Sequence, residues 1–220
     1  MPDTPPTATL DGTGPRTAVR PVRLGIHGAP HLATRIIRAA GHRPEEVEFV
    51  PYDVAEPFRP LREGAVDVMI VKYVLREPDI AVGDPVAFDD RALIVGADHP
   101  LADRASVSIE EAAPYDSFSC PGDFPPYVWD LVVPPHTPRG TPIRRVHPMT
   151  TVEGMVEVLT DTRAVHVSFA SLEAVLPPHI RAVPVHDLPP APVALARLRD
   201  AELPPPAAAL LADAERQARR

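Results

Sequence analysis

The stretch LREGAVDVMI at residues 61–70 combines the end of a helix with the start of a buried strand. Gly64 is typical of a helix end, because glycine adopts the left-handed backbone conformation without steric cost. Residues 67–71 are then rich in apolar side chains, as in parallel strands that are covered on both faces. The stretch therefore predicts a helix-to-strand junction inside an α/β fold.

The residues before this junction show the same alternation. Residues 22–26 and 47–52 have the composition of strands, with a helical pattern between them. Asp53 and Glu56 have the spacing of a capping box, which predicts that a second helix begins there and runs to Gly64. The order strand–helix–strand–helix–strand favours a sheet with right-handed crossovers.

The rest of the chain continues the alternation of strands and helices. Two more pairs with capping-box spacing, Ser108 with Glu111 and Thr150 with Glu153, predict helix starts. The proline-heavy passage at 121–142 is expected to be mostly loop, with about one turn of helix. Strands are expected at 92–97, 115–119, 144–147, 164–169, 183–185 and 192–198, and a last helix at 206–219.

Composition excludes several classes of protein. The 220 residues carry a net charge of −8, which disfavours nonspecific attraction to nucleic acid and to anionic membranes. A single cysteine, Cys120, excludes an internal disulfide and a multi-cysteine zinc site. No phosphate-binding loop, dinucleotide fingerprint or Gly-x-Ser-x-Gly turn occurs. No cofactor and no metal are therefore expected.

The first 21 residues differ in composition from the rest. Residues 1–21 are rich in proline, threonine, alanine and glycine and show no apolar periodicity, so we expect a disordered leader. They lack the basic start and apolar stretch of a signal peptide, and no apolar run is long enough to cross a bilayer. The expected location is the cytoplasm.

Four phrases in a fixed order resemble the effector-binding domain of LysR-type transcriptional regulators. They are VRLGI at 22–26, LREGAVDVMI at 61–70, DHPLA at 98–102 and TVEGMVEVL at 151–159. Their order and spacing together make the set specific. The resemblance covers roughly residues 22–198.

The resemblance implies a two-lobed α/β fold of the type 2 periplasmic-binding-protein kind, with a central ligand cleft. Lobe I would comprise residues 22–91 and 185–220, and lobe II residues 92–184. The crossovers would lie near residues 92–97 and 178–185. The winged helix-turn-helix of the family has no counterpart in the short leader, so we expect a domain without its own means of reading DNA.

Ligands in such folds bind where strands end and helix N-termini point, because free backbone N–H groups and the helix dipole favour anions. Nine residues at such places form the predicted ligand site. They are His27, His31, Lys72, Tyr73, Ser119, Cys120, Thr150, Thr151 and Ser168.

Three of these residues carry the most chemistry. Lys72 is the sole lysine and directly follows a buried strand, so its ammonium either meets a ligand carboxylate or lies solvated on a loop. His27 and His31 are four residues apart without the glutamate of a metalloprotease motif. They are candidate hydrogen-bonding or acid–base groups of the cleft, although each alone is more typical of an exposed surface.

Three other residues each allow a functional and a structural interpretation. Cys120 ends a strand, but most lone cysteines are small apolar fillers rather than nucleophiles. His166 lies in an alternating strand and faces either the cleft or the core. Trp129 either covers an aromatic ligand or anchors its own loop.

Three functions fit these features. The first is a sensor or accessory protein that binds a small anionic or aromatic metabolite in the cleft. The second is a cofactor-independent enzyme, lyase-like or cyclase-like, that uses His27 and His31 for acid–base chemistry. The third is a subunit that pairs with a full-length regulator. A biosynthetic gene cluster around the gene would favour the enzyme, and an adjacent full-length regulator would favour the partner.

No direct contact with nucleic acid or membrane is expected for any of these functions. A homodimer is also expected, since LysR-type effector domains pair side by side through the first lobe. The apolar residues Leu32, Ile36 and Ile37 supply a candidate surface, unless they pack on their own sheet.

Overall fold

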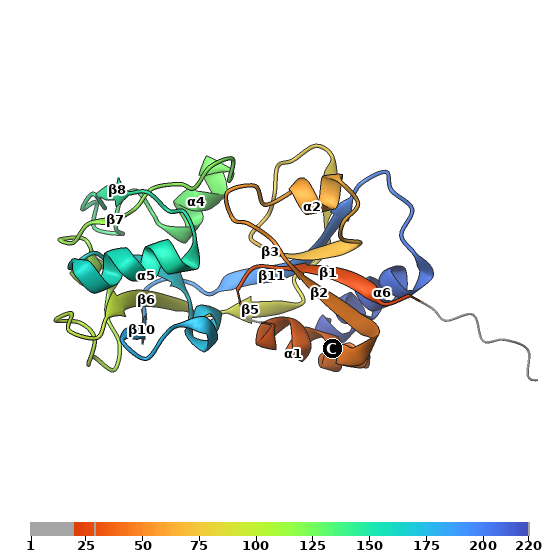
Figure 1. Cartoon of the computed structure of the whole chain (residues 1–220), viewed down its shortest axis with the longest axis horizontal. Helices are drawn as coiled ribbons and strands as arrows, with labels where there is room; N and C mark the ends of the chain where they lie inside the picture. The colour runs from red at the N-terminus through yellow and green to blue at the C-terminus, as the bar shows by residue number, and fades with distance from the viewer. Residues whose placement is uncertain (1–19, 29, 220) are drawn as a thin grey trace, which may run out of the picture.

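The computed structural model describes residues 20–28 and 30–219, so nearly all of the predicted leader lies outside the described residues. The described residues form two lobes that lie end to end along the long axis (Figure 1). The first lobe is built on a six-stranded sheet, and the second on a three-stranded sheet and a two-stranded ribbon. The two-lobed α/β architecture that the family resemblance implies is confirmed.

The first lobe collects elements from both ends of the chain. Its elements are β1 (Val22–Ile26), α1 (His31–Ala39), the 3-10 helix η1 (Pro44–Glu46), β2 (Val47–Pro51), α2 (Arg59–Arg62), β3 (Val68–Lys72), β4 (Ile80–Val82), β5 (Ala87–Asp89), β11 (Ala191–Leu198) and α6 (Pro205–Ala218). The strand order is β2-β1-β3-β11-β4, and β5 also pairs with β11. Strands β1, β2 and β3 are parallel, whereas β11 runs antiparallel to its neighbours.

The second lobe consists of the middle of the chain. Its elements are β6 (Arg91–Gly96), α3 (Ile109–Ala112), β7 (Ser117–Phe118), α4 (Pro126–Val132), β8 (Arg145–His147), α5 (Val152–Asp161), β9 (His166–Phe169), the 3-10 helix η2 (Ala170–Val175) and β10 (Ile180–Pro184). Its main sheet has the antiparallel order β10-β6-β9. The chain enters this lobe at Asp90, between β5 and β6, and leaves it between β10 and β11.

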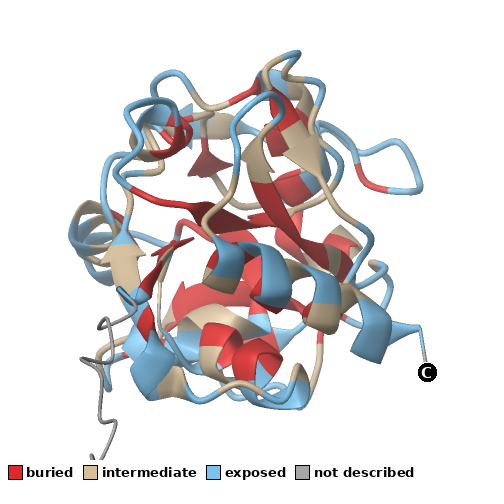
Figure 2. Cartoon of the chain, turned by 90° about the vertical axis from the view of Figure 1, so that its right-hand side faces the viewer, coloured by how far each residue is buried: buried red, intermediate tan, exposed pale blue. Residues whose placement is uncertain are grey.

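The sheet of the first lobe is apolar on both faces because its central strands alternate between two cores. On β3, Val68 and Ile70 pack toward α1 and α6, whereas Met69 and Val71 pack toward α2. Figure 2 shows the buried strands inside and the more exposed helix surfaces outside. Gly25 allows β1 and β3 to approach closely, since a Cβ at this position would lie 2.9 Å from Cβ of Met69.

Helix α1 buries the face that we considered for a dimer. Leu32, Ile36 and Ile37 belong to the core between the sheet and α6. Their exposed fractions are at most 7%. These three residues therefore pack on their own sheet, which was the alternative to a dimer contact. The face offers no free apolar surface for a second copy.

The three capping boxes predicted from the sequence had different outcomes. Ser108 caps α3 as predicted, and the Glu111 carboxylate accepts a hydrogen bond from the backbone N of Ser108 at 2.9 Å. The N-cap of α5 is Thr151 rather than Thr150, and its Oγ1 accepts from the backbone N of Gly154 at 3.1 Å.

The helix predicted from Asp53 to Gly64 is wrong for most of its length. Only α2, a single turn, is helical in this segment. The Asp53 carboxylate instead closes a local turn by accepting from the backbone N of Ala55 at 2.8 Å. Pro57 explains the difference, since the residue before a proline is disfavoured in helical conformation.

Candidate functional site

A cavity of about 140 Å³ lies between the two lobes. Parallel strands β1 and β3 end at the same edge of their sheet, so Ile26 and Lys72 meet the cavity from the first lobe. Helix α4 and strand β9 contribute Trp129, His166 and Ser168 from the second lobe. The cavity is thus formed where strand ends of one lobe face the other lobe, which is where ligands bind in open α/β folds.

Lys72 at the end of β3 is held by partners within the protein. Its Nζ lies 3.0 Å from the Asp89 carboxylate and 3.3 Å from Oγ of Ser171, to which it donates. The ammonium also lies 3.9 Å from the ring centroid of Phe169, within the range of a cation–π contact. Burial lowers the pKa of Lys72, and the Asp89 carboxylate opposes that shift. The only cation of the cavity wall among the described residues therefore already has a counterion.

Replacing Lys72 with methionine is expected to destabilise the fold by about 2 kcal/mol. The change leaves the carboxylate of Asp89, whose side chain is 6% exposed, without a counterion. A broken buried pair costs more, but the Lys72 side chain is 20% exposed and water screens part of the effect. Urea unfolding measures this loss. The double variant Lys72→Met with Asp89→Asn should recover stability, because the amide removes the unpaired charge and its oxygen can still accept from the backbone N of Ser171, as Asp89 does at 3.1 Å. Full stability of the single variant would contradict the ion pair.

Arg91 at the start of β6 connects several elements around the cavity through hydrogen bonds. Its side chain is buried and donates to four oxygens: the carbonyl of Ser168 at 3.1 Å, the hydroxyl of Tyr73 at 2.8 Å, the carbonyl of Leu131 at 3.0 Å and the carbonyl of Val132. These bonds occupy the guanidinium. Arg91 therefore acts as a structural brace rather than a free anion-binding group.

Tyr73 follows Lys72 in an unusual backbone conformation. Its φ of 65° is in the left-handed region, which is uncommon for a residue that is not glycine. This conformation sends the side chain across to α4, where its hydroxyl donates to the carbonyl of Leu131 at 3.2 Å. Tyr73 does not line the cavity, so it supports the site instead of facing a ligand.

His166 on β9 is a buried polar group inside an aromatic environment. It is 4% exposed, and its Nδ1 has no hydrogen-bond partner. Its ring stacks on Trp129 with centroids 5.9 Å apart and meets Phe118 edge-on at 5.3 Å. Burial, with smaller contributions from the charges of Arg91 and His27, lowers the pKa of His166 to about 3. His166 is therefore a neutral imidazole at neutral pH.

His27 follows β1 and lines the cavity from the first lobe. Its Nδ1 lies 3.4 Å from the carbonyl oxygen of Tyr52, and the two rings have centroids 5.6 Å apart. Part of His27 is exposed, but the surrounding protein atoms lower its pKa, and the nearby ammonium of Lys72 adds to this effect.

The structure brings together four of the nine predicted site residues. His27, Lys72, Thr151 and Ser168 line the cavity. His31 does not, since it begins α1 with an exposed side chain. The predicted pair of cleft histidines at 27 and 31 is therefore not formed.

The other three predicted residues have local contacts outside the cavity lining. The Ser119 hydroxyl donates to the carbonyl of His147 at 3.1 Å. Cys120 is half-buried with its thiol on the carbonyl of Phe124, and burial raises its pKa, which disfavours the reactive thiolate. Thr150 is exposed just before the cap of α5.

Thr151 lines the cavity and also caps α5, so its replacement by valine is expected to cost about 1 kcal/mol of stability. Thr151→Ser keeps the hydroxyl acceptor and should retain the wild-type value. Thr150→Val is the matched control on the neighbouring threonine, which makes no capping bond. Thermal unfolding distinguishes the three, and equal losses at both positions would contradict the assigned cap.

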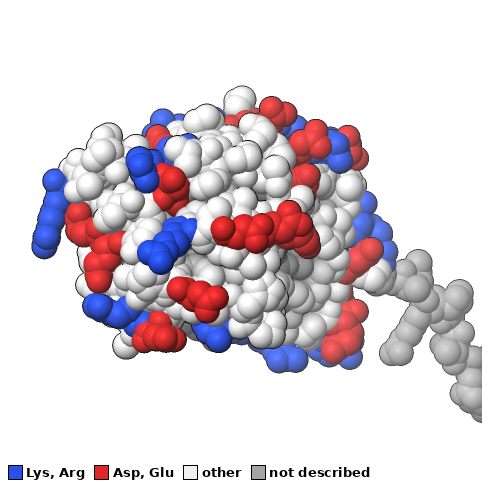
Figure 3. Space-filling view, turned by 60° about the vertical axis from the view of Figure 1, so that its left-hand side comes forward, with Lys and Arg blue, Asp and Glu red and all other residues white. Residues whose placement is uncertain are grey.

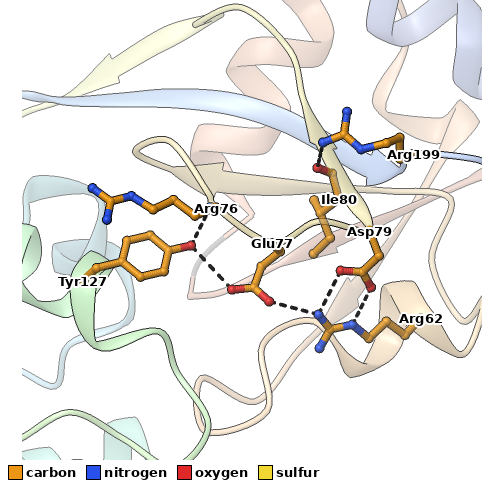
Figure 4. Close-up of polar contacts among 7 residues, drawn as sticks. All are labelled: Arg62, Arg76, Glu77, Asp79, Ile80, Tyr127 and Arg199. Atoms are coloured by element: carbon orange, nitrogen blue, oxygen red, sulfur yellow. Dashed lines mark hydrogen bonds and ion pairs between the residues drawn. The ribbon is translucent and has the colours of Figure 1, made fainter.

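A second set of polar contacts joins the lobes beside the cavity (Figure 4). The hydroxyl of Tyr127 on α4 accepts from the backbone N of Arg76 at 2.6 Å. The same hydroxyl lies 3.5 Å from the carboxylate of Glu77, which pairs with Arg62 at 3.1 Å. Leu75, in the same loop, lines the cavity. These contacts hold the loop after β3 against the second lobe.

Sequence reasoning missed much of this site. Asp89, Arg91 and Ser171 lie far from Lys72 in the chain, and no local pattern links them to it. The sequence allows two interpretations for His166 and two for Trp129, and the structure places both residues at the cavity. The available signal was the alternation of β9, which puts His166 and Ser168 on one face.

Two features are absent from the described part of the chain. No group of three or more histidine, cysteine, aspartate or glutamate side chains there could hold a metal ion. Among the same residues, no helix has both the length and the apolar character needed to traverse a bilayer.

The fold is similar to several solved structures of LysR-type proteins. The effector-binding domain of QuiR in complex with shikimate is 18% identical with a TM-score of 0.65, and the match covers 90% of this chain and 96% of that one. CbnR, a LysR family transcriptional regulator, is 16% identical with a TM-score of 0.69, covering 90% and 69%. The effector-binding domain of BenM with benzoate is 15% identical with a TM-score of 0.59, covering 90% and 91%.

A comparison with curated protein sequences finds no match. At these identities the structural similarity speaks for the fold, that of type 2 periplasmic-binding proteins. The model of the LysR substrate binding domain matches residues 18–219, nearly the whole chain. The chain therefore belongs to the LysR substrate-binding domain family.

Proposed function

We propose that this domain binds a small metabolite in the cavity between its lobes and serves as an effector sensor or accessory protein. The observation that carries the proposal is the cavity itself, which both lobes line and whose wall includes the imidazole of the buried residue His166. The similarity to domains that bind shikimate and benzoate supports this proposal.

A metabolite screen by thermal shift tests the proposal if it is run on three forms of the protein. Leu172→Trp places a large ring at the cavity wall and should abolish the stabilisation by any true ligand. Val175→Trp is the matched control on the same 3-10 helix, because Val175 is exposed and does not line the cavity. A ligand that stabilises all three forms equally would bind elsewhere and contradict the proposed site.

The enzyme alternative has lost its main support. It rested on His27 and His31 acting together, and His31 is exposed and does not line the cavity. A general acid or base needs to reach the reacting atoms, and pairs of groups with separated pKa values are the usual sign of such chemistry. No specific observation favours a lyase or cyclase over a binding domain.

Pairing with a second copy or with a full-length regulator remains a proposal. The buried face of α1 does not supply the contact, so a dimer would use other surfaces.

The 220-residue chain is expected to show no sequence-specific DNA binding at physiological salt. Its net charge is −8, and DNA affinity depends on clusters of lysine and arginine that neutralise phosphates. On the face shown in Figure 3, blue and red side chains are interspersed over the described residues without a continuous basic surface. Fluorescence anisotropy with labelled DNA checks this, and sub-micromolar, sequence-dependent binding would contradict it.

A further inference from the structure

The polar groups of the cavity wall show which ligand charge the site accepts. Seven lining residues carry a polar side chain: His27, Tyr52, Lys72, Thr151, His166, Ser168 and Ser171. No arginine, aspartate or glutamate lines the cavity among the described residues. The remaining wall is apolar, with aromatic rings from both lobes such as Phe58 and Trp129.

A ligand carboxylate would have no free cation to bind. The ammonium of Lys72 is paired with Asp89 at 3.0 Å and lies on the ring of Phe169. The guanidinium of Arg91 is occupied by four protein oxygens. An anionic ligand would therefore have to compete with the Asp89 carboxylate or be buried without a partner, and both are costly.

The size of the cavity limits the ligand to about one ring. Its volume of about 140 Å³ is close to the roughly 150 Å³ of an engineered apolar cavity that binds benzene. Aromatic side chains on several sides favour a flat ligand through offset or edge-on ring contacts.

The imidazole of His166 offers such a ligand a polar contact. His166 lies at the cavity wall between the rings of Trp129 and Phe118. Its Nδ1 is buried away from any ligand and lacks a partner, so a ligand in the cavity would approach the imidazole at Nε2. A neutral imidazole nitrogen is a donor or an acceptor according to its tautomer. A hydroxyl group satisfies either tautomer, because it both donates and accepts.

We propose that the cavity selects an uncharged, single-ring aromatic molecule with one hydroxyl group, which hydrogen-bonds to His166. This proposal rests on the proposed function, since it names the class of ligand for the same site. It departs from the expectation that Lys72 binds a ligand carboxylate. The ligand ring packs against Trp129, and the hydroxyl meets the imidazole of the histidine.

The fluorescence of Trp129 gives a direct test, because it is the single tryptophan of the chain and lines the cavity. Three probes of similar size are titrated: phenol, toluene and benzoate. Phenol is expected to bind about three- to tenfold more tightly than toluene, the value of one neutral hydrogen bond. Benzoate is expected to bind at least about tenfold more weakly than phenol at neutral pH, because its carboxylate finds no free cation.

The variant His166→Phe assigns the preference to the proposed contact. It keeps an aromatic ring beside Trp129 and removes the nitrogen, so phenol and toluene should then bind equally. His99→Phe is the matched control, since His99 is also buried but does not line the cavity, and the phenol-to-toluene ratio should stay at its wild-type value.

The outcomes separate this inference from the proposed function. Tighter binding of benzoate than of phenol would overturn the inference and leave a small-molecule site in the cavity. A phenol preference that survives His166→Phe would overturn the assigned contact. If no single-ring probe changes the Trp129 signal, the ligand class is wrong. The proposed function then fails only if the metabolite screen also yields no ligand sensitive to Leu172→Trp.

Discussion

Replacing Arg91 with methionine is expected to lower the free energy of unfolding by about 4 kcal/mol. The change keeps most of the side-chain volume but removes the donors to the carbonyls of Ser168, Leu131 and Val132. Arg91 is 3% exposed, so these carbonyls lose charge-assisted bonds at a site with little access for water. Each orphaned buried group costs on the order of 1–3 kcal/mol, and the losses in one cluster are not additive.

Urea unfolding at neutral pH measures this loss. Arg91→Lys should rescue little of it, because an ammonium cannot reproduce the forked geometry of the guanidinium. Arg104→Met is the matched control: Arg104 is exposed and makes one ion pair, with Glu111 at 3.4 Å. The free energy of unfolding of the Arg104→Met variant should fall by less than about 1 kcal/mol. A loss for Arg91→Met as small as that of the control would show that the brace does not exist in solution.

Lowering the pH is expected to destabilise the protein through His166. Its pKa is about 3 in the folded chain, against an ordinary value of 6.5 that applies to the unfolded chain. His166 is therefore protonated below pH ~6.5 in the unfolded state but only below pH ~3 in the folded state. The stability that the neutral form of His166 contributes is fully present above pH ~6.5 and is lost as the pH falls from ~6.5 to ~3. The lowering of the His166 pKa from 6.5 to about 3 corresponds to about 4–5 kcal/mol of stability over the whole window.

Between pH 7 and pH 5, the wild type is expected to lose about 2 kcal/mol more stability than the variant His166→Phe. Other titrating groups affect both proteins alike, so the difference isolates the histidine. His99→Phe serves as the comparison for a buried histidine outside the cavity. Urea unfolding at the two pH values gives the numbers, and parallel pH dependence of wild type and His166→Phe would contradict the buried, neutral state.

Local signals predicted the parts of the fold that depend on near neighbours. The junction at residues 61–70 reappears as α2, a turn and β3. The capping box of Ser108 and Glu111 is correct because all its atoms lie within one helical turn. The prediction at Asp53 failed because Pro57 overrides the capping signal four residues later.

The site was harder to predict because its contacts join distant parts of the chain. The sequence places Lys72 at a strand end, but its partner Asp89 is brought to it because β3 and β5 pair with opposite edges of the same part of β11. Nothing in the sequence indicates that pairing. His166 could be placed on one face of β9, yet the choice between cleft and core depended on where α4 packs.

The central claim is that a small molecule binds between the two lobes, and a crystal structure of the chain with phenol or a hit of the metabolite screen tests it most directly. The account predicts density for the ligand beside Trp129 and within hydrogen-bond distance of the imidazole of His166, with Lys72 still paired to Asp89. A ligand found on the outer surface of either lobe, with the cavity free of it, would contradict the account.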